Sequence, residues 1–197
     1  MMTGRYWHRQ GAPNQPALPI DPATSEALAL LMNTLIDSFV IVTEVAQGPA
    51  LAGALFERKY HAAMPDFGHH IVAFWKREDA SFVPASYVHF TDCGDIFLAG
   101  GACTDGSVLR AMSAAQQAAV ADYGALMLAT LRYGFDRYGP RCDAVFTCCG
   151  DLRALQTTPI VGFIETGVPH LLVRWMRDLS SARTAELIAK ARSFMPF

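Results

Sequence analysis

The chain has 197 residues, of which 52% are hydrophobic and 17% are charged, and its formal net charge is -2. This composition is typical of a globular protein with a substantial core, and it excludes a disordered chain. A charge so close to zero gives no electrostatic case for nucleic-acid binding. No apolar run is long enough to cross a bilayer, so we expect no membrane partner either.

The N-terminal 20 residues carry three prolines and no periodic apolar pattern, and they lack the apolar centre of a signal peptide. The five cysteines include no C-x-x-C pair, which fits reduced thiols. We therefore expect a cytoplasmic protein made of an arm (residues 1–20), one domain (residues 21–178) and a C-terminal helical extension (residues 179–197).

Two helices are predicted in the first third of the chain. Asp21 followed by Pro22 is typical of a helix start, and an apolar stripe continues from there to Val42. The β-branched run Val40–Thr43 suits a strand equally well, so both alternatives stay open at this point. A second helix is predicted over Pro49–Ala63, before the break at Pro65 and Gly68.

Three consecutive antiparallel strands follow, at His69–Lys76, Phe82–Thr91 and Ile96–Ala99, because β-branched and aromatic residues dominate these runs. The last two are joined by a turn over Asp92–Asp95, where Gly94 is free to adopt a positive φ. Pairing of the first two strands around their own turn would bring His70 and His89 together, although a one-residue slip would reverse the faces.

A long helix is predicted next, because Ser113 and Gln116 match a capping box and apolar residues then recur at spacings of three and four. This stripe consists of Val120, Tyr123, Met127, Leu131, Phe135 and Tyr138. Gly139 and Pro140 end it, and a short strand follows at Asp143–Thr147. A strand–helix–strand unit therefore follows the hairpin, which predicts a mixed sheet and an α/β fold.

The C-terminal part contains a short helix at Asp151–Thr158, two strands at Gly162–Thr166 and His170–Trp175, and a final amphipathic helix over residues 179–192. The segment with Gly162, Phe163 and Gly167 resembles the end of the GNAT superfamily of acyl-CoA-dependent N-acyltransferases. The resemblance implies a single domain with a mixed, mostly antiparallel central sheet flanked by helices.

The resemblance also implies an activity: transfer of an acetyl or acyl group from coenzyme A to a small amine. Such a protein would bind acetyl-CoA or another acyl-CoA as co-substrate, with no metal, and exposed strand edges of such folds often pair into homodimers. The residues implied to hold the coenzyme lie on the third strand and in the long helix. They are Leu98, Ala99, Gly100, Gly101 and Ala102, followed by Ala121, Asp122, Tyr123, Gly124 and Ala125.

The pyrophosphate motif of the family, R/Q-x-x-G-x-G/A, matches this helix only in part. In one alignment of the motif with the helix, only Gly124 matches a motif position. In another alignment, Gln116 matches the first position, but the first glycine of the motif is absent. A carboxylate at Asp122 that lay ~4 Å from a phosphate oxygen would repel it by ~4 kcal/mol at an effective dielectric of ~20. Either Asp122 points away, or the protein does not hold coenzyme A in the usual manner.

Two catalytic positions of the family are vacant: Leu98–Ala102 carries no carboxylate, and Thr158 stands where a tyrosine is typical. His89 and His70 are the candidate bases because histidine titrates near neutral pH, and Tyr87 is the candidate proton donor. Each of the three also suits a packing role on a strand. The candidate acceptor pocket at the end of the second helix consists of Glu57, Tyr60 and His61.

Three alternatives remain. A metal site from His69, His70 and His89 is disfavoured because neighbouring strand residues point to opposite faces. Cys103 would need an adjacent base to act as a nucleophile, and a buried structural thiol is the simpler interpretation. Finally, the vacant catalytic positions also suit a GNAT-shaped binding or assembly module that does not transfer acyl groups.

Overall fold

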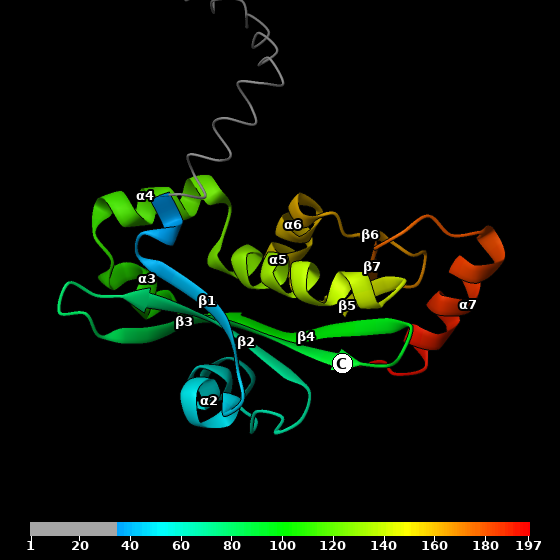
Figure 1. Ribbon diagram of the computed structural model, residues 1–197, viewed down its shortest axis with the longest axis horizontal. Helices are drawn as coiled ribbons and strands as arrows, with labels where there is room; N and C mark the ends of the chain where they lie inside the picture. The colour runs from blue at the N-terminus through cyan, green and yellow to red at the C-terminus, as the bar shows by residue number, and fades with distance from the viewer. Residues whose placement is uncertain (1–34) are drawn as a thin grey trace, which may run out of the picture.

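The computed structural model describes residues 35–197, and its centre is a seven-stranded sheet (Figure 1) with the order β1-β2-β3-β4-β5-β7-β6. Within it, β4 and β5 pair in parallel and the other neighbours pair antiparallel. The strands are β1 (Val40–Val45), β2 (His69–Lys76), β3 (Phe82–Asp92), β4 (Ile96–Thr104), β5 (Ala144–Cys148), β6 (Ile164–Glu165) and β7 (Leu171–Trp175). The predicted α/β fold with a mixed, mostly antiparallel sheet is confirmed.

Helices cover both faces of this sheet (Figure 1). The helices α4 and α5 pack on one face, while α2 and α7 pack on the other. The helices are α2 (Gly48–Tyr60), α3 (Gly106–Ala111), α4 (Ala114–Tyr123), α5 (Leu126–Tyr138), α6 (Leu152–Thr157) and α7 (Ser181–Arg192). Two short 3₁₀ helices are η1 (Gly139–Arg141) and η2 (Thr158–Val161). Across residues 35–197, no helix is both long and apolar enough to cross a membrane.

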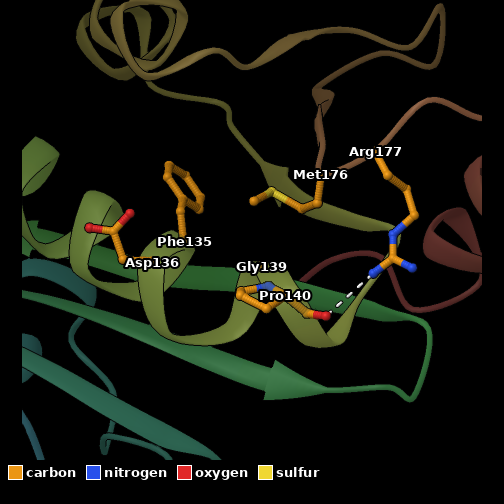
Figure 2. A pocket seen from close by; sticks show the side chains of 6 residues that line it. All are labelled: Phe135, Asp136, Gly139, Pro140, Met176 and Arg177. Atoms are coloured by element: carbon orange, nitrogen blue, oxygen red, sulfur yellow. Dashed lines mark hydrogen bonds between the residues drawn. The ribbon is translucent and has the colours of Figure 1, made fainter.

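The end of α5 and the end of β7 enclose a shallow pocket of about 630 Å³ (Figure 2). Met176 and Gly139 lie against each other in its lining, since a Cβ at Gly139 would lie 2.2 Å from the Met176 Cε atom. The Arg177 guanidinium donates hydrogen bonds to the carbonyl oxygens of Cys142 (2.8 Å) and Pro140 (3.4 Å). These contacts tie the exit of β7 to the turn after α5.

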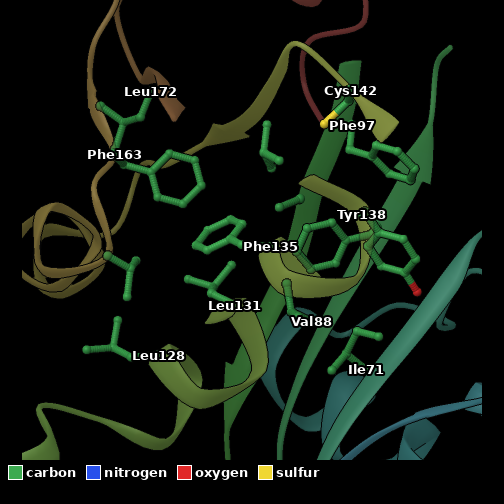
Figure 3. Close-up of a cluster of buried hydrophobic side chains, with 14 of the residues drawn as sticks. Ile71, Val88, Phe97, Leu128, Leu131, Phe135, Tyr138, Cys142, Phe163 and Leu172 are labelled. Carbon is green, nitrogen blue, oxygen red and sulfur yellow. The ribbon is translucent and has the colours of Figure 1, made fainter. Parts of the chain in front are cut away.

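The core of the molecule lies between α5 and the sheet (Figure 3). Leu128, Leu131, Phe135 and Tyr138 follow the spacing of one helix face and are all buried. The close approach of helix and sheet requires Gly134, since a Cβ there would lie 2.2 Å from the Phe90 Cζ atom.

The predicted C-terminal extension is packed against the sheet. Leu187 and Ala191 of α7 are fully buried among side chains of β4, β5 and β7. Polar contacts hold the same helix: Arg183 pairs with Asp95 (2.5 Å) and Asp143 (3.0 Å), and Lys190 also pairs with Asp95 (2.5 Å). Apolar burial and a shared carboxylate therefore dock α7 together.

Three sequence predictions need correction. The run from Val40 forms strand β1, so the strand alternative holds, while the predicted start at Asp21 lies outside the described residues. Residues 106–111, for which no helix is predicted from the sequence, form α3, which has Asp105 as its N-cap. The predicted long helix is two helices, because Gly124 has φ 105° and a Cβ there would lie 2.8 Å from the Leu128 Cδ1 atom.

Candidate functional site

The two parallel strands at the centre of the sheet pair over only part of their length. The register runs from Ile96↔Ala144 to Ala99↔Thr147 and then stops. Strand β4 continues to Thr104, while β5 ends at Cys148 and is paired with β7 on its other side. Among residues 35–197, no strand pairs with β4 from Gly100 onward on the side where β5 would otherwise lie, and we call this side its free edge.

A β-bulge marks the point where β4 leaves β5. His89 pairs with Gly100 and Tyr87 pairs with Cys103, so β4 carries one residue more than β3 between these pairs. Gly101 has φ 58°, and a Cβ there would lie 2.7 Å from the Phe56 Cε2 atom. Because bulges bend a strand and increase its twist, this one explains why β4 diverges, and only glycine fits it without strain.

The carbonyl groups beyond the bulge point to different sides. The Cys103 carbonyl accepts a hydrogen bond from the Ser86 hydroxyl at 3.0 Å and so faces β3. Successive carbonyls of a strand alternate in direction, so the Ala102 carbonyl faces the free edge. There it accepts a hydrogen bond from the Tyr60 hydroxyl at 2.7 Å.

A helix N-terminus opens near the same region. Helix α5 begins after Ala125 with no side-chain cap and no acidic residue in its first turn. Its first N–H groups have no partner within the helix, and the helix dipole makes this end positive. Asp122 lies before the break, on the exposed last turn of α4. Gly124 lies beside Ile160 of η2, on the segment that follows β5.

The predicted coenzyme residues therefore differ in accessibility. On β4, Leu98 and Ala99 are buried, whereas the free-edge residues Gly100, Gly101 and Ala102 are half-buried. In the helical region, Ala121 and Asp122 are exposed, and Tyr123, Gly124 and Ala125 are half-buried. The free-edge residues and those leading into α5 are the accessible part of this set.

The three candidate catalytic side chains lie together beneath α2. His70, Tyr87 and His89 are 3%, 0% and 7% exposed. The His70 Nδ1 atom lies 2.8 Å from the Tyr87 hydroxyl, and the His89 Nε2 atom lies 2.6 Å from the Phe67 carbonyl oxygen. Burial lowers the pKa of both histidines and raises the pKa of Tyr87, so all three are held in their neutral forms.

The candidate acceptor residues are at the exit of α2, and all three are exposed. His61 is the C-cap with φ 54°, and its N–H donates to the Glu57 carbonyl oxygen. Tyr60 alone of the three contacts β4. Although the Tyr60 side chain is 41% exposed, partial desolvation of its phenol raises the pKa of Tyr60 and keeps the hydroxyl protonated as a donor.

Two residues that the sequence analysis did not single out belong to this region. Lys59 pairs with Asp151, just after β5, at 3.2 Å, and Arg58 pairs with Asp105 at the end of β4. The sequence did indicate that both residues stabilise the end of α2, because basic side chains in the last turn of a helix interact favourably with its negative end. Their partners lie 47 and 92 residues away, which no local pattern reveals.

The remaining candidates lie apart from the free edge. His69 is on the opposite face from His70 and pairs with Glu44 at 2.7 Å. Cys103 is buried, and burial raises the pKa of its thiol to about 12. In the part of the chain that the structure describes, no three His, Cys, Asp or Glu side chains are grouped to hold a metal.

No protein-family model matches the chain, and no curated protein matches its sequence. Among solved structures, the chain is similar to the ribosomal-protein-S18-alanine N-acetyltransferase from Escherichia coli. That match has a TM-score of 0.48 and 11% identity, and it covers 72% of this chain and 97% of that one. N-acetylglutamate synthase from Neisseria gonorrhoeae, complexed with coenzyme A and L-arginine, gives a TM-score of 0.48 and 12% identity, over 71% of this chain and 34% of that one.

A third similar structure is apo FdhC, a nucleotide-linked sugar GNAT, with a TM-score of 0.44 and 10% identity over 80% of this chain and 95% of that one. Identities of 10–12% and TM-scores below 0.5 transfer no substrate, cofactor or catalytic residue to this chain.

Proposed function

We propose that this protein is an acyltransferase that moves an acetyl or acyl group from coenzyme A to a small amine. The observation that carries the proposal is the free edge of β4 beyond Ala99. A strand edge offers N–H and C=O groups to any extended ligand with matching amides. The pantetheine arm of coenzyme A is a slender chain with two amide groups, so it suits this edge.

The start of α5 supports the same ligand. An uncapped helix N-terminus without acidic residues favours phosphate groups, through both its free N–H groups and its dipole. Tyr123, Gly124 and Ala125 lead into this end and are the proposed pyrophosphate contacts. The exposed position of Asp122 on α4 favours the alternative in which its carboxylate points away from the phosphates.

The chemistry requires the amine nitrogen to form a bond to the thioester carbonyl carbon while the carbon–sulfur bond breaks. The ammonium proton is lost, and the thiolate of coenzyme A takes up a proton. The burial of His70, Tyr87 and His89 favours a positioning role beneath α2 for these candidates. The exposed Glu57 and His61 at the exit of α2, or water, are then the proposed proton acceptors.

A calorimetric titration with acetyl-CoA tests binding, and release of free coenzyme A thiol with a panel of primary amines tests transfer. At about 100 times the dissociation constant, the ligand should add about 2.7 kcal/mol of stability. Absence of heat at millimolar protein and ligand would overturn the proposal.

A matched pair of variants locates the phosphates. Ala125→Glu places a carboxylate at the start of α5 and should weaken coenzyme A binding by at least about tenfold through charge repulsion. Ala118→Glu adds the same charge on the exposed face of α4 and should leave binding unchanged. Equal effects of the two variants would remove α5 from the proposed site.

A second candidate function is a binding module without acyl transfer. The observation that favours it is Thr158, which stands at the position of the usual acid and is buried, with its hydroxyl donating to the Ala154 carbonyl oxygen at 2.9 Å. The two functions differ in one result: an acyltransferase would release thiol with an amine of the panel, whereas a binding or assembly module would release none, and stabilisation by coenzyme A would count against the module.

A further inference from the structure

The last turn of α2 makes three contacts from three consecutive residues. Arg58 pairs with Asp105 at the end of β4, Lys59 with Asp151 after β5, and Tyr60 with the carbonyl of Ala102. Consecutive residues of a helix project about 100° apart, so one turn can reach three separate targets. Ala102 lies on β4, Asp105 follows β4 directly, and Asp151 lies on the β5 side of the gap between the strands.

The Tyr60 contact occupies a group that a ligand at the free edge would use. The Cys103 carbonyl accepts a hydrogen bond from Ser86 of β3 and so does not face the free edge. The Ala102 carbonyl faces the free edge and already accepts the Tyr60 proton at 2.7 Å. The Tyr60 phenol therefore stands on the side of the Ala102 carbonyl from which an amide N–H of a pantetheine arm would approach.

The Lys59 contact crosses the gap itself. Helix α2 packs on the β3–β4 side of the sheet, whereas Asp151 follows β5. The Lys59 Nζ and Asp151 Oδ2 atoms are 3.2 Å apart, and the two side chains are 48% and 52% exposed. Exposed ion pairs are weak, so this bridge can open without a large loss of stability.

We infer that Lys59 and Tyr60 form a latch over the free edge of β4, and that coenzyme A must displace Tyr60 from the Ala102 carbonyl to bind. This inference rests on the proposed function and specifies how access to the same site is regulated. The Phe56 ring, with its centroid 4.6 Å from that of Tyr60, holds the aromatic body of the latch.

The test compares coenzyme A binding to the wild type and to Tyr60→Phe by calorimetry. The variant keeps the packing on Phe56 and removes only the hydroxyl. One hydrogen bond fewer to break predicts binding between about twofold and tenfold tighter. Tyr133→Phe, on half-buried Tyr133 of α5, is the matched control and should bind as the wild type does. Unchanged melting temperatures would show that both variants fold.

The outcomes separate the latch from the proposed function. Equal affinity of wild type and Tyr60→Phe would overturn the latch while the coenzyme site stands, and weaker binding by the variant would make Tyr60 a ligand contact instead. No binding by any variant would overturn the proposed function and the latch with it. Hydrogen exchange adds an independent readout: coenzyme A should speed exchange of the amides of residues 57–61, and slower exchange there would contradict an opening latch.

Discussion

The imidazole rings of His70 and His89 stack beneath α2, with their centroids 5.5 Å apart and 20° between their planes. Their Cα atoms are register partners on β2 and β3, as the sequence predicted. The His70 ring also contacts the start of α2, since a Cβ at Gly48 would lie 2.2 Å from the His70 Cγ atom. A proton on either ring would thus be buried beside the other ring and near the positive end of a helix.

The burial of these two histidines predicts that the folded protein loses stability at acidic pH. Burial lowers the pKa of both histidines below the value of about 6.5 that they have in the unfolded chain. As pH falls, the unfolded chain therefore takes up protons first, so the stabilisation is complete above about pH 6.5 and declines as pH falls toward the folded pKa values. Urea unfolding at pH 7.5 and 5.5 should show a lower midpoint at pH 5.5. Asp66 and Glu44 oppose the shift of His70 and reduce the effect.

The matching variant is His89→Gln, whose amide can still donate to the Phe67 carbonyl but does not titrate. It should show a smaller change of midpoint between the two pH values than the wild type does. His61→Gln removes an exposed histidine and should leave the pH dependence as it is. A wild-type change equal to that of His89→Gln would exclude His89 as a source of the acid sensitivity.

The bulge in β4 predicts an unequal cost for two glycine substitutions. Gly94→Ala, in the open turn before β4, meets no atom within 4 Å and pays only the cost of its φ of 84°, about 1–2 kcal/mol. Gly101→Ala has a similar backbone cost at φ 58°, and its methyl group also clashes with the Phe56 ring. We therefore expect this substitution to destabilise the protein by about 2–4 kcal/mol. Urea denaturation measures both, and equal costs would show that Phe56 moves aside freely.

Replacing glycine with alanine should stabilise the protein at one helical position and destabilise it at another. Gly53→Ala in α2 meets no atom within 4 Å and should stabilise the protein by about 0.5–1 kcal/mol through helix propensity. Gly134→Ala in α5 places a methyl group against the Phe90 ring. The resulting overpacking should destabilise the protein by about 1–3 kcal/mol, which is more than alanine gains over glycine in helix propensity. A stabilising Gly134→Ala would mean that α5 lies farther from β3 than the structure shows.

The ion pairs of Asp95 with α7 should contribute measurably to the stability of the protein. The Asp95 carboxylate accepts from both Lys190 and Arg183, and these hydrogen bonds lower its pKa. Asp95→Asn should cost about 1–2 kcal/mol, because charge-assisted bonds are lost from a partly buried site. Asp92→Asn, which breaks the exposed pair with Arg141, should cost less than about 1 kcal/mol. Equal values in chemical denaturation would assign the docking of α7 to apolar burial alone.

Local chemistry determined much of the fold from the sequence by itself. The bounds of β2 match the prediction residue for residue, because β-branched and aromatic residues dominate the run from His69 to Lys76. The capping box of Ser113 and Gln116 forms as predicted, since both partners lie within one helical turn. The hairpin turn at Gly94 is local in the same way, whereas the parallel pairing of β4 with β5 follows from the strand–helix–strand order, because a helix crossover joins parallel strands.

Only the tertiary structure decided where the long apolar stripe breaks and which side chains reach the free edge. The stripe from Val120 to Tyr138 keeps helical spacing across Gly124, so periodicity alone cannot show the break that packing of Leu128 and Ile160 creates there. The contact of Tyr60 with Ala102 joins residues 42 positions apart. Burial of the histidines likewise depends on where α2 lies, because propensity acts over a few residues whereas exclusion of water depends on the whole assembled sheet.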